Sequence, residues 1–131
     1  MKRLCIISLI LSVMIFLCAC SKTSVDKQPE ITLSFVYEDK NISVVLESYE
    51  AEQISDILDG NAYNSLFFGI PSCGFNEKVS LKVGNCIFAI ACDNCNYIQD
   101  LSNLKYFDIS AEDMKYIRSL FVKYGGYFPC I

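Results

Sequence analysis

The first twenty residues decide which part of this 131-residue chain can fold as a globular domain. Lys2 and Arg3 give a basic start, and a predominantly apolar run of 14 residues follows from Leu4 to Leu17. A helix that spans a bilayer needs roughly 20 apolar residues, so this run is too short for an anchor and has the flanks of an export signal. We therefore expect the folded domain to begin beyond it.

The end of this signal carries the motif Leu17-Cys18-Ala19-Cys20, followed at once by polar Ser21. A lipobox requires a branched apolar residue three positions before a cysteine, small residues beside the cleavage site, and a thiol that carries a lipid. With these residues the chain resembles the bacterial lipoprotein precursors. The resemblance implies cleavage after Ala19 and a lipid on Cys20, the first residue of the mature protein. A plain secretory signal cut at the same place is the alternative.

A lipidated Cys20 implies both a partner and a location. Two acyl chains hold a protein stably on a membrane, whereas a single chain gives marginal binding. The partner implied is therefore the membrane itself, reached through the lipid, with the protein on the extracytoplasmic face of the cell membrane. We expect three parts: a signal peptide over 1–19, a lipidated flexible tether over 20–30, and a single domain over 31–131. The tether is polar and lacks periodicity.

Charge and composition exclude several classes of function. Removal of residues 1–19 takes two of the eleven basic side chains and none of the fifteen acidic ones, which leaves nine against fifteen and a net charge of −6. This balance argues against nucleic acid as a partner. The chain has no histidine, so mechanisms that use a histidine base, and histidine metal sites, are excluded. No glycine-rich phosphate loop is present, and we expect no cofactor.

Alternating apolar residues predict two β-hairpins. One joins 31–37 to 42–46 through the polar turn 38–41. The other joins Lys78–Val83 to Cys86–Ala91 through Gly84-Asn85, because glycine accepts the positive φ of a two-residue turn. Pairing across this turn places three pairs on one core face, with Ser80 and Lys82 pointing outward. The three pairs are Val83 with Cys86, Leu81 with Phe88, and Val79 with Ile90.

Helical spacing predicts two helices. The first covers 49–58 after Ser48 and is stopped by Gly60. Its acidic residues are expected to form a solvated outer face and not a catalytic carboxylate pair; they are Glu50, Glu52, Asp56 and Asp59. The second begins after the cap residue Ser110, has an apolar stripe, and ends at Gly125-Gly126. The stripe consists of Met114, Ile117, Leu120 and Phe121.

The remaining segments complete the expected fold. The pattern predicts a strand over 105–109 and at most one helical turn over 96–101. The apolar segment 66–71 is predicted to be a buried connection. Lys115 and Arg118 read as surface charges on the second helix. The aromatic side chains Tyr116, Tyr124, Tyr127 and Phe128 are expected to fold over the sheet and not to form an exposed patch. The fold class is α+β, with about five mostly antiparallel strands, two helices and disulfide staples.

Five cysteines lie beyond Cys20, and an exported chain favours disulfides. Five is an odd number, and Cys86, on the expected core face, is our candidate for the unpaired thiol. The disulfide candidates are Cys73, Cys92, Cys95 and Cys130, which permit three connectivities. One arrangement joins Cys130 to Cys92 or Cys95, while Cys73 reaches the other.

Two other roles for these cysteines are open. Cys92-Asp93-Asn94-Cys95 is a Cys-x-x-Cys motif after a predicted strand, the arrangement that thiol-disulfide oxidoreductases use. The preceding βαβ unit of those enzymes is absent from the pattern. A four-cysteine zinc site prefers two such pairs, and only one exists here, so we expect no metal. The structural disulfide is the interpretation that we adopt, with no catalytic residue assigned.

The stretches Ala91–Cys95 and Lys123–Cys130, together with the lipobox, resemble small cysteine-containing lipoproteins of clostridia-type bacteria. The resemblance implies a location and a fold, and no specific activity. We therefore predict a membrane-anchored binding or structural lipoprotein that is not an enzyme, with a protein or small-molecule partner that the sequence does not identify. The alternative is an oxidoreductase that uses Cys92 and Cys95.

Overall fold

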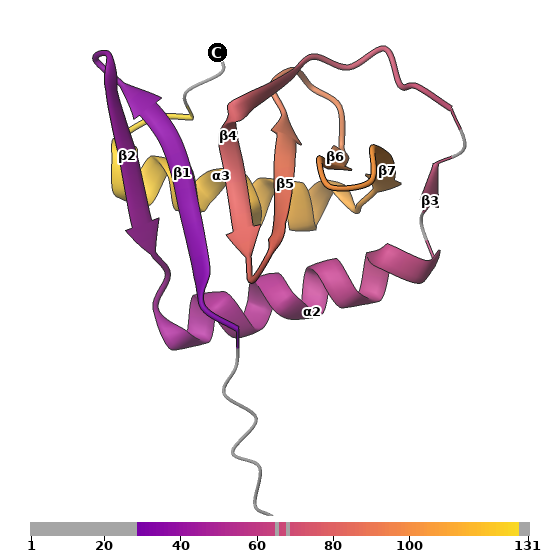
Figure 1. The fold of residues 1–131 in the computed structure, drawn as a ribbon, viewed down its shortest axis with the longest axis horizontal. Helices are drawn as coiled ribbons and strands as arrows, with labels where there is room; N and C mark the ends of the chain where they lie inside the picture. The colour runs from indigo at the N-terminus through magenta and orange to yellow at the C-terminus, as the bar shows by residue number, and fades with distance from the viewer. Residues whose placement is uncertain (1–28, 65, 68, 129–131) are drawn as a thin grey trace, which may run out of the picture.

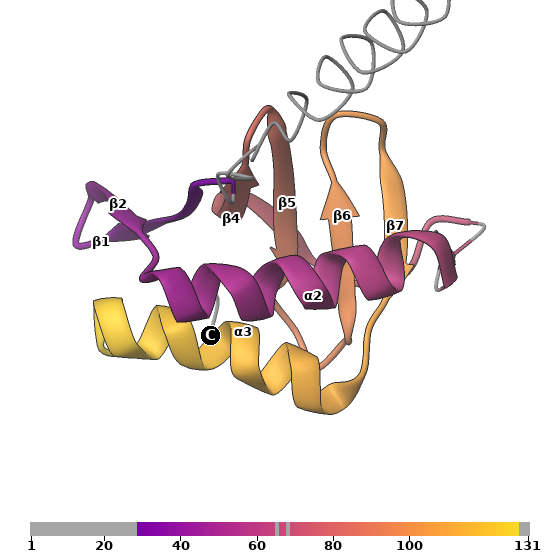
Figure 2. The ribbon, with the colours of Figure 1, turned by 90° about the horizontal axis from the view of Figure 1, so that it is seen from below.

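A seven-stranded antiparallel sheet with two helices on one side forms the domain. The structure is a computed structural model that describes residues 29–64, 66, 67 and 69–128. Within these residues the sheet has the order β2-β1-β4-β5-β6-β7-β3, and Figure 2 shows both helices on the same side of it. The elements are β1 Ile31–Tyr37, β2 Lys40–Val45, α2 Ser48–Asn64, β3 Leu66–Phe67, β4 Phe75–Val83, β5 Cys86–Ala91, β6 Tyr97–Asp100, β7 Lys105–Asp108 and α3 Ala111–Gly125.

The α+β class is thereby confirmed, and the described sheet has seven strands where about five were expected. Residues 96–101 were expected to form at most a helical turn, which is wrong, because 97–100 form β6 between β5 and β7. The extra pairing satisfies backbone groups that a lone turn leaves open. The burial expected over 66–71 is wrong at Ile70, which is 86% exposed. The side chains of 61–68 lie outside the described residues.

Both predicted hairpins are present. Glu38 and Asp39 have φ values of 46° and 61°, so they form a two-residue turn of the type that suits twisted strands. The predicted four-residue turn over 38–41 is therefore wrong, because Lys40 and Asn41 already pair with β1. In the second hairpin, Gly84 has φ 57°, and Val83 lies opposite Cys86 as expected. Leu81 lies opposite Phe88, as expected. Val79 lies in the interval between Phe75 and Ser80 where the register shifts, so its pairing with Ile90 stays a prediction, although both side chains are buried in the core.

The sheet curls strongly, which the sequence pattern did not indicate. The rings of Phe75 on β4 and Tyr106 on β7 lie 5.6 Å apart, although two strands separate them in the sheet. In a flat sheet three strand spacings amount to about 14 Å. Figure 1 shows the curl, because β1 and β4 lie in the plane of the view while β6 and β7 appear almost end-on.

The curl explains why Ser80 is buried and does not point into solvent. By register, Phe75 and Tyr106 share the sheet face that carries Ser80, Ala89 and Ala91. This face is opposite to the helices, yet Ser80 is 5% exposed and the two alanines are fully buried. The aromatic pair lies on this face near the open end of the central hairpin, where the small side chains are buried. The outward position predicted for Ser80 is therefore wrong. Nearer the turn the same face stays exposed at Lys82 and Ile87.

Helix α2 continues to Asn64, so the predicted stop at Gly60 is wrong. A glycine inside a helix costs about 1 kcal/mol relative to alanine but does not end the helix unless it takes up a left-handed conformation. Gly60 does not have a positive φ, whereas Gly126, which ends α3, has φ 83°. The conformation of the glycine, and not its presence, marks the helix end.

Helix α3 packs as its pattern predicts. Ser110 Oγ accepts a hydrogen bond from the Asp113 N–H at 3.0 Å, and the whole predicted apolar stripe is buried. Phe121 is at the centre of an aromatic row, with ring centroids 5.9 Å from Phe35 and 5.4 Å from Phe128. The tail therefore folds onto the core at Phe128, as expected, while Tyr127 stays 44% exposed beside Tyr37.

Alanine substitution is expected to change the stability of the domain in opposite directions at two glycines. At Gly125 an added Cβ would lie 2.6 Å from the Phe35 ring, so we expect Gly125→Ala to destabilise the domain by about 1–3 kcal/mol. At Gly60 a Cβ would meet nothing within 4 Å, so Gly60→Ala is expected to stabilise it by about 0.5–1 kcal/mol. Urea unfolding followed by circular dichroism measures both. Equal effects of the two substitutions would contradict this packing.

Candidate functional site

A disulfide joins the two loops that flank the central hairpin. Cys73 lies before β4 and Cys95 lies after β5, and their bond links segments 22 residues apart, with 6.1 Å between the Cα atoms. We call residues 71–75 and 92–96 the loop pair. Both cysteines were predicted to be disulfide-bonded, and the fold joins them to each other, which is one of the three connectivities that the sequence left open. The bond connects the two chain segments at the open end of the hairpin.

Asp93 ties the loop pair together independently of the disulfide. Its Oδ2 accepts a hydrogen bond from the Gly74 N–H at 2.9 Å, and its Oδ1 accepts one from the Cys95 N–H at 3.0 Å. The Cys92 N–H donates to the Gly74 carbonyl at 2.8 Å. The N–H groups of Gly74 and Cys95 lower the pKa of the Asp93 carboxyl, so this side chain is an anion that the backbone already satisfies.

Arg118 of α3 donates hydrogen bonds to backbone carbonyls in and next to the second loop of the pair, residues 92–96. Its Nη2 donates to the carbonyls of Ala91 and Cys95 at 3.1 Å each, and also to the carbonyl of Asp93. Its guanidinium lies 5.2 Å from the centroid of the Phe128 ring. The expectation of a surface charge is therefore wrong for Arg118, because three carbonyls in a turn create a site that a planar cation fits. Lys115 is exposed, as expected.

The Cys-x-x-Cys motif does not close on itself. Cys95 is bonded to Cys73, and Cys92 is disulfide-bonded as well. Cys130 lies outside the described residues, so its pairing stays a prediction. With Cys95 occupied, the predicted arrangement leaves Cys92 as the partner of Cys130. This geometry gives no support to the alternative of an oxidoreductase with a Cys92–Cys95 redox pair. Cys20 also lies outside the described residues.

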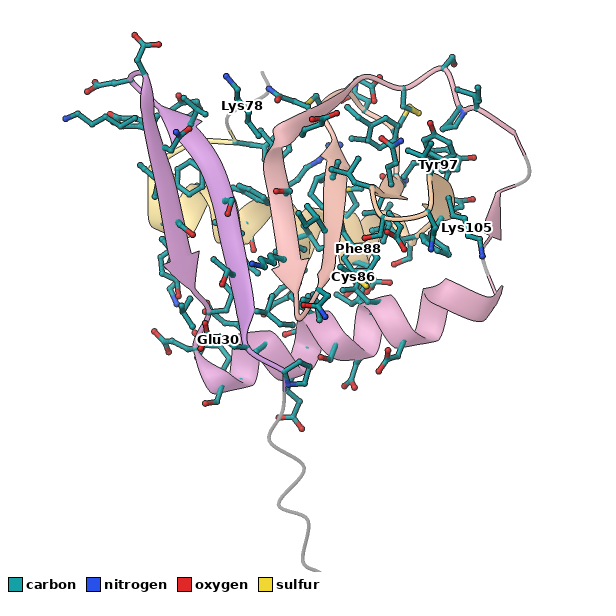
Figure 3. The ribbon with its side chains drawn as sticks, in the orientation of Figure 1. Glu30, Lys78, Cys86, Phe88, Tyr97 and Lys105 are labelled. Atoms are coloured by element: carbon teal, nitrogen blue, oxygen red, sulfur yellow. A yellow bond between two sulfur atoms is a disulfide. The ribbon has the colours of Figure 1, made fainter. Side chains whose placement is uncertain are left out.

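Cys86 is the free cysteine of the described residues, as expected, but its place in the core is wrong. The thiol is exposed because it lies at the first position of β5, beside the turn between β4 and β5 (Figure 3). Its neighbour on the same face, Phe88, is only partly buried. The core face of this hairpin therefore closes over Leu81 and Ile90 and opens toward the turn.

A second polar cluster surrounds Glu50, which sequence analysis placed on the solvated face of α2. That placement is wrong, because Glu50 is 1% exposed. Its carboxylate accepts hydrogen bonds from Lys123 Nζ and from the Tyr124 hydroxyl at 2.7 Å each. It also accepts one from the Glu47 N–H at 3.1 Å, so it reaches back to the helix N-cap as the glutamate of a capping box does. Glu52, Asp56 and Asp59 are exposed, as expected.

Opposing effects act on the ionisation of Glu50. Burial raises its pKa, but hydrogen bonds from Lys123, Tyr124 and the Glu47 backbone outweigh burial and hold the pKa below its ordinary value of 4.5. The same contact raises the pKa of Lys123, whose side chain is 42% exposed and which also lies 3.5 Å from Glu47. The cluster is an ionised link between the start of α2 and the end of α3.

The seam between α2 and α3 carries two shallow hollows, of about 440 and 400 Å³. Both are lined by Gln53 and Asp113, and both are wide open to solvent. Tyr116 lines the second hollow, and its hydroxyl is buried without a hydrogen-bond partner. Neither hollow includes a cysteine or Arg118. The predicted site residues and the described hollows are therefore in different parts of the molecule.

No protein-family model, no curated protein and no solved structure that was compared with the chain matches it. Function therefore has to be argued from the chemistry of the site itself. Among the described side chains, the loop pair is the place where predicted site residues meet, namely Cys73, Cys92 and Cys95. Sequence reasoning missed Asp93, Arg118 and Glu50, whose roles depend on backbone groups brought from elsewhere in the chain.

Replacement of Glu50 by glutamine is expected to destabilise the domain by about 1–3 kcal/mol at pH 7, because the amide group places a donor among the four donors that surround the carboxylate. The folded-state pKa of Glu50 is lowered, so its stabilisation is present above pH 4.5 and is lost as the pH falls through the folded value. The difference between wild type and Glu50→Gln should therefore shrink toward acid pH in urea unfolding. The exposed Glu52→Gln is the control, with less than about 0.5 kcal/mol expected.

Replacement of Arg118 by lysine tests the carbonyl site. A lysine ammonium has the charge but not the planar fork, so we expect a loss of about 1–3 kcal/mol and faster amide hydrogen exchange over 92–96. Lys115→Arg on the same helix is the control and should leave both unchanged. If Arg118→Lys changed global stability without faster exchange in this loop, the assigned role of Arg118 would be wrong.

Proposed function

We propose that this chain is a bacterial lipoprotein, lipidated on Cys20 and held on the extracytoplasmic face of the cell membrane, where it displays a disulfide-stabilised binding or structural domain. The observation that carries the proposal is the pairing of a lipobox with structural disulfides in the same chain. The lipobox ends at Cys20, and beyond it Cys73 and Cys95 are bonded to each other. Each feature is typical of exported proteins, and the two arise from unrelated parts of the sequence.

The surface position of the bonded cysteines supports the proposal that the domain lies in an oxidising compartment. Cys73 and Cys95 lie in loops at the surface of the domain, where cytosolic reductants would keep thiols reduced. Closure of a loop of this size constrains the unfolded chain and stabilises the domain by about 3 kcal/mol. A small domain with a modest core gains more from such a staple than a large one does.

In this proposal the lipid on Cys20 supplies the anchor. No helix in the described residues is long and apolar enough to cross a membrane. Two acyl chains on Cys20 would supply stable attachment, at about 0.8 kcal/mol for each methylene group buried in the bilayer. The ten residues from Ser21 to Glu30 would then let the domain stand up to about 35 Å from the lipid.

A binding or structural role fits the loop pair better than catalysis does. Both carboxylate oxygens of Asp93 accept hydrogen bonds from backbone N–H groups. One guanidinium nitrogen of Arg118 donates to three backbone carbonyls. A catalytic acid, base or nucleophile needs a free atom within reach of a substrate. The polar groups of the loop pair instead fix the shape of an exposed loop, which suits recognition by a rigid surface.

The proposal predicts that Cys20 carries the lipid. We would express the full chain in bacteria fed an alkyne-tagged fatty acid, then separate membrane and soluble fractions and determine the intact mass. Wild type should carry the tag and fractionate with membranes, while Cys20→Ala should lose the tag completely. The control is Cys86→Ala, which removes the free exposed thiol and should keep the tag.

Two results would contradict the proposal. An untagged wild-type protein would show that Cys20 is not lipidated, and loss of the tag in Cys86→Ala would place the lipid on the wrong cysteine. Peptide mapping of the wild type without reductant completes the test. Recovery of reduced Cys73 and Cys95 from freshly isolated membranes would argue against the oxidising compartment.

A further inference from the structure

Three side chains of the loop pair bring together the atoms that a thiophilic metal ion binds. The Sγ atoms of Cys73 and Cys95 and a carboxylate oxygen of Asp93 lie within 4.8 Å of one another. Zinc takes thiolate sulfur and carboxylate oxygen as ligands, and a site with three protein ligands leaves the fourth position for water. The one Cys-x-x-Cys motif of the chain contributes Cys95 to this group, and the second sulfur comes from Cys73 in the other loop and not from Cys92.

We propose that the Cys73–Cys95 bond is a redox-gated zinc site: a two-electron reductant, a dithiol or a phosphine, opens the bond, and the two thiolates and Asp93 then bind one Zn²⁺. The reductant loses two electrons, a dithiol leaving as its own disulfide and a phosphine as its oxide with oxygen from water. The S–S bond breaks to give two thiols. Zinc binding forms two Zn–S bonds and one Zn–O bond and releases two protons. This goes beyond the lipoprotein proposal and does not depend on the lipid.

The loop pair keeps its arrangement when the disulfide opens, because other contacts also join it. Asp93 still accepts from the Gly74 and Cys95 N–H groups, and the Cys92 N–H still donates to the Gly74 carbonyl. Arg118 still holds the carbonyls around Asp93 from α3. The two thiolates therefore stay near each other, and the entropy cost of forming the site is small compared with that in a free loop.

The distances that zinc requires are within reach of side-chain rotation. Two sulfur ligands at about 2.3 Å from a tetrahedral zinc ion lie about 3.8 Å apart. A disulfide holds its sulfur atoms about 2.0 Å apart, so each Sγ has to move by only about 1 Å. The bonds from the Gly74 and Cys95 N–H groups orient the Asp93 carboxylate, as second-shell partners orient metal ligands, and each oxygen keeps a lone pair for zinc.

Charge also favours the ion at this position. Two thiolates and one carboxylate carry three negative charges, so the zinc complex carries one. The guanidinium of Arg118 donates to the carbonyls of Asp93 and Cys95, next to two of the ligands, and balances that remaining charge. The balance matters because an uncompensated charge in a partly buried loop is costly.

The first experiment needs no variant. Full-length protein is purified from detergent-lysed bacterial cells, so that its recovery does not require the lipid. It is reduced with a phosphine, divided into samples with and without Zn²⁺, and alkylated briefly with iodoacetamide before peptide mapping. The phosphine also opens the disulfide of Cys92. We expect zinc to protect Cys73 and Cys95 together, and to leave Cys92 and Cys86, which lies at the far end of β5, reactive. Protection of only one of the two, or of neither, would overturn the proposal.

A second experiment tests the carboxylate. The zinc affinity of the reduced protein is measured by competition with a chelating dye for wild type, Asp93→Asn and the control Asp108→Asn, an exposed carboxylate on β7. We expect Asp93→Asn to weaken binding about tenfold or more and Asp108→Asn to leave it unchanged. Circular dichroism establishes that each variant is folded. An unchanged affinity in folded Asp93→Asn would overturn the three-ligand site.

Discussion

Arg118 joins parts of the molecule that are far apart in the sequence. From the middle of α3 it reaches three carbonyls of the loop after β5, and its guanidinium lies over the ring of Phe128 in the tail. A turn that points several carbonyls inward needs a donor there, since buried carbonyls without partners are costly. The guanidinium supplies it, and so fixes the loop in which Asp93 and Cys95 meet the segment around Cys73. The loop pair therefore depends on α3 as much as on its own disulfide.

The curl of the sheet also joins distant segments, on the sheet face opposite the helices. A two-layer domain normally leaves one sheet face in solvent, so its outward residues alternate with core residues. Here Phe75 and Tyr106 are in contact on that face near the open end of the central hairpin, where Ala89 and Ala91 are fully buried. Three small side chains, Ser80, Ala89 and Ala91, are thus buried on the sheet face opposite the helices.

Local patterns in the sequence predicted the elements, and contacts between distant segments account for what they missed. The turn of the second hairpin and the ends of α3 depend on neighbouring residues, and the predictions for them were correct. Ser80 and Glu50 were placed in solvent because period and polarity describe one element at a time. Glu50 is buried only because Lys123 and Tyr124, more than 70 residues away, complete its hydrogen bonds. No periodicity contains that information.

For the cysteines, too, the sequence predicted part of the outcome and the rest depended on contacts between distant segments. Cysteine count and compartment predicted disulfides with Cys86 left over, whereas the choice of Cys73 for Cys95 required the fold. The fold also explains why the odd thiol is tolerated. Cys86 begins β5 and Cys92 follows its end, so about 20 Å of extended strand separates the free thiol from the bonded cysteines. Thiol-disulfide exchange requires direct contact between sulfur atoms. Within one folded molecule the free thiol therefore has no path to the loop pair, and the rigid strand between them protects the pairing.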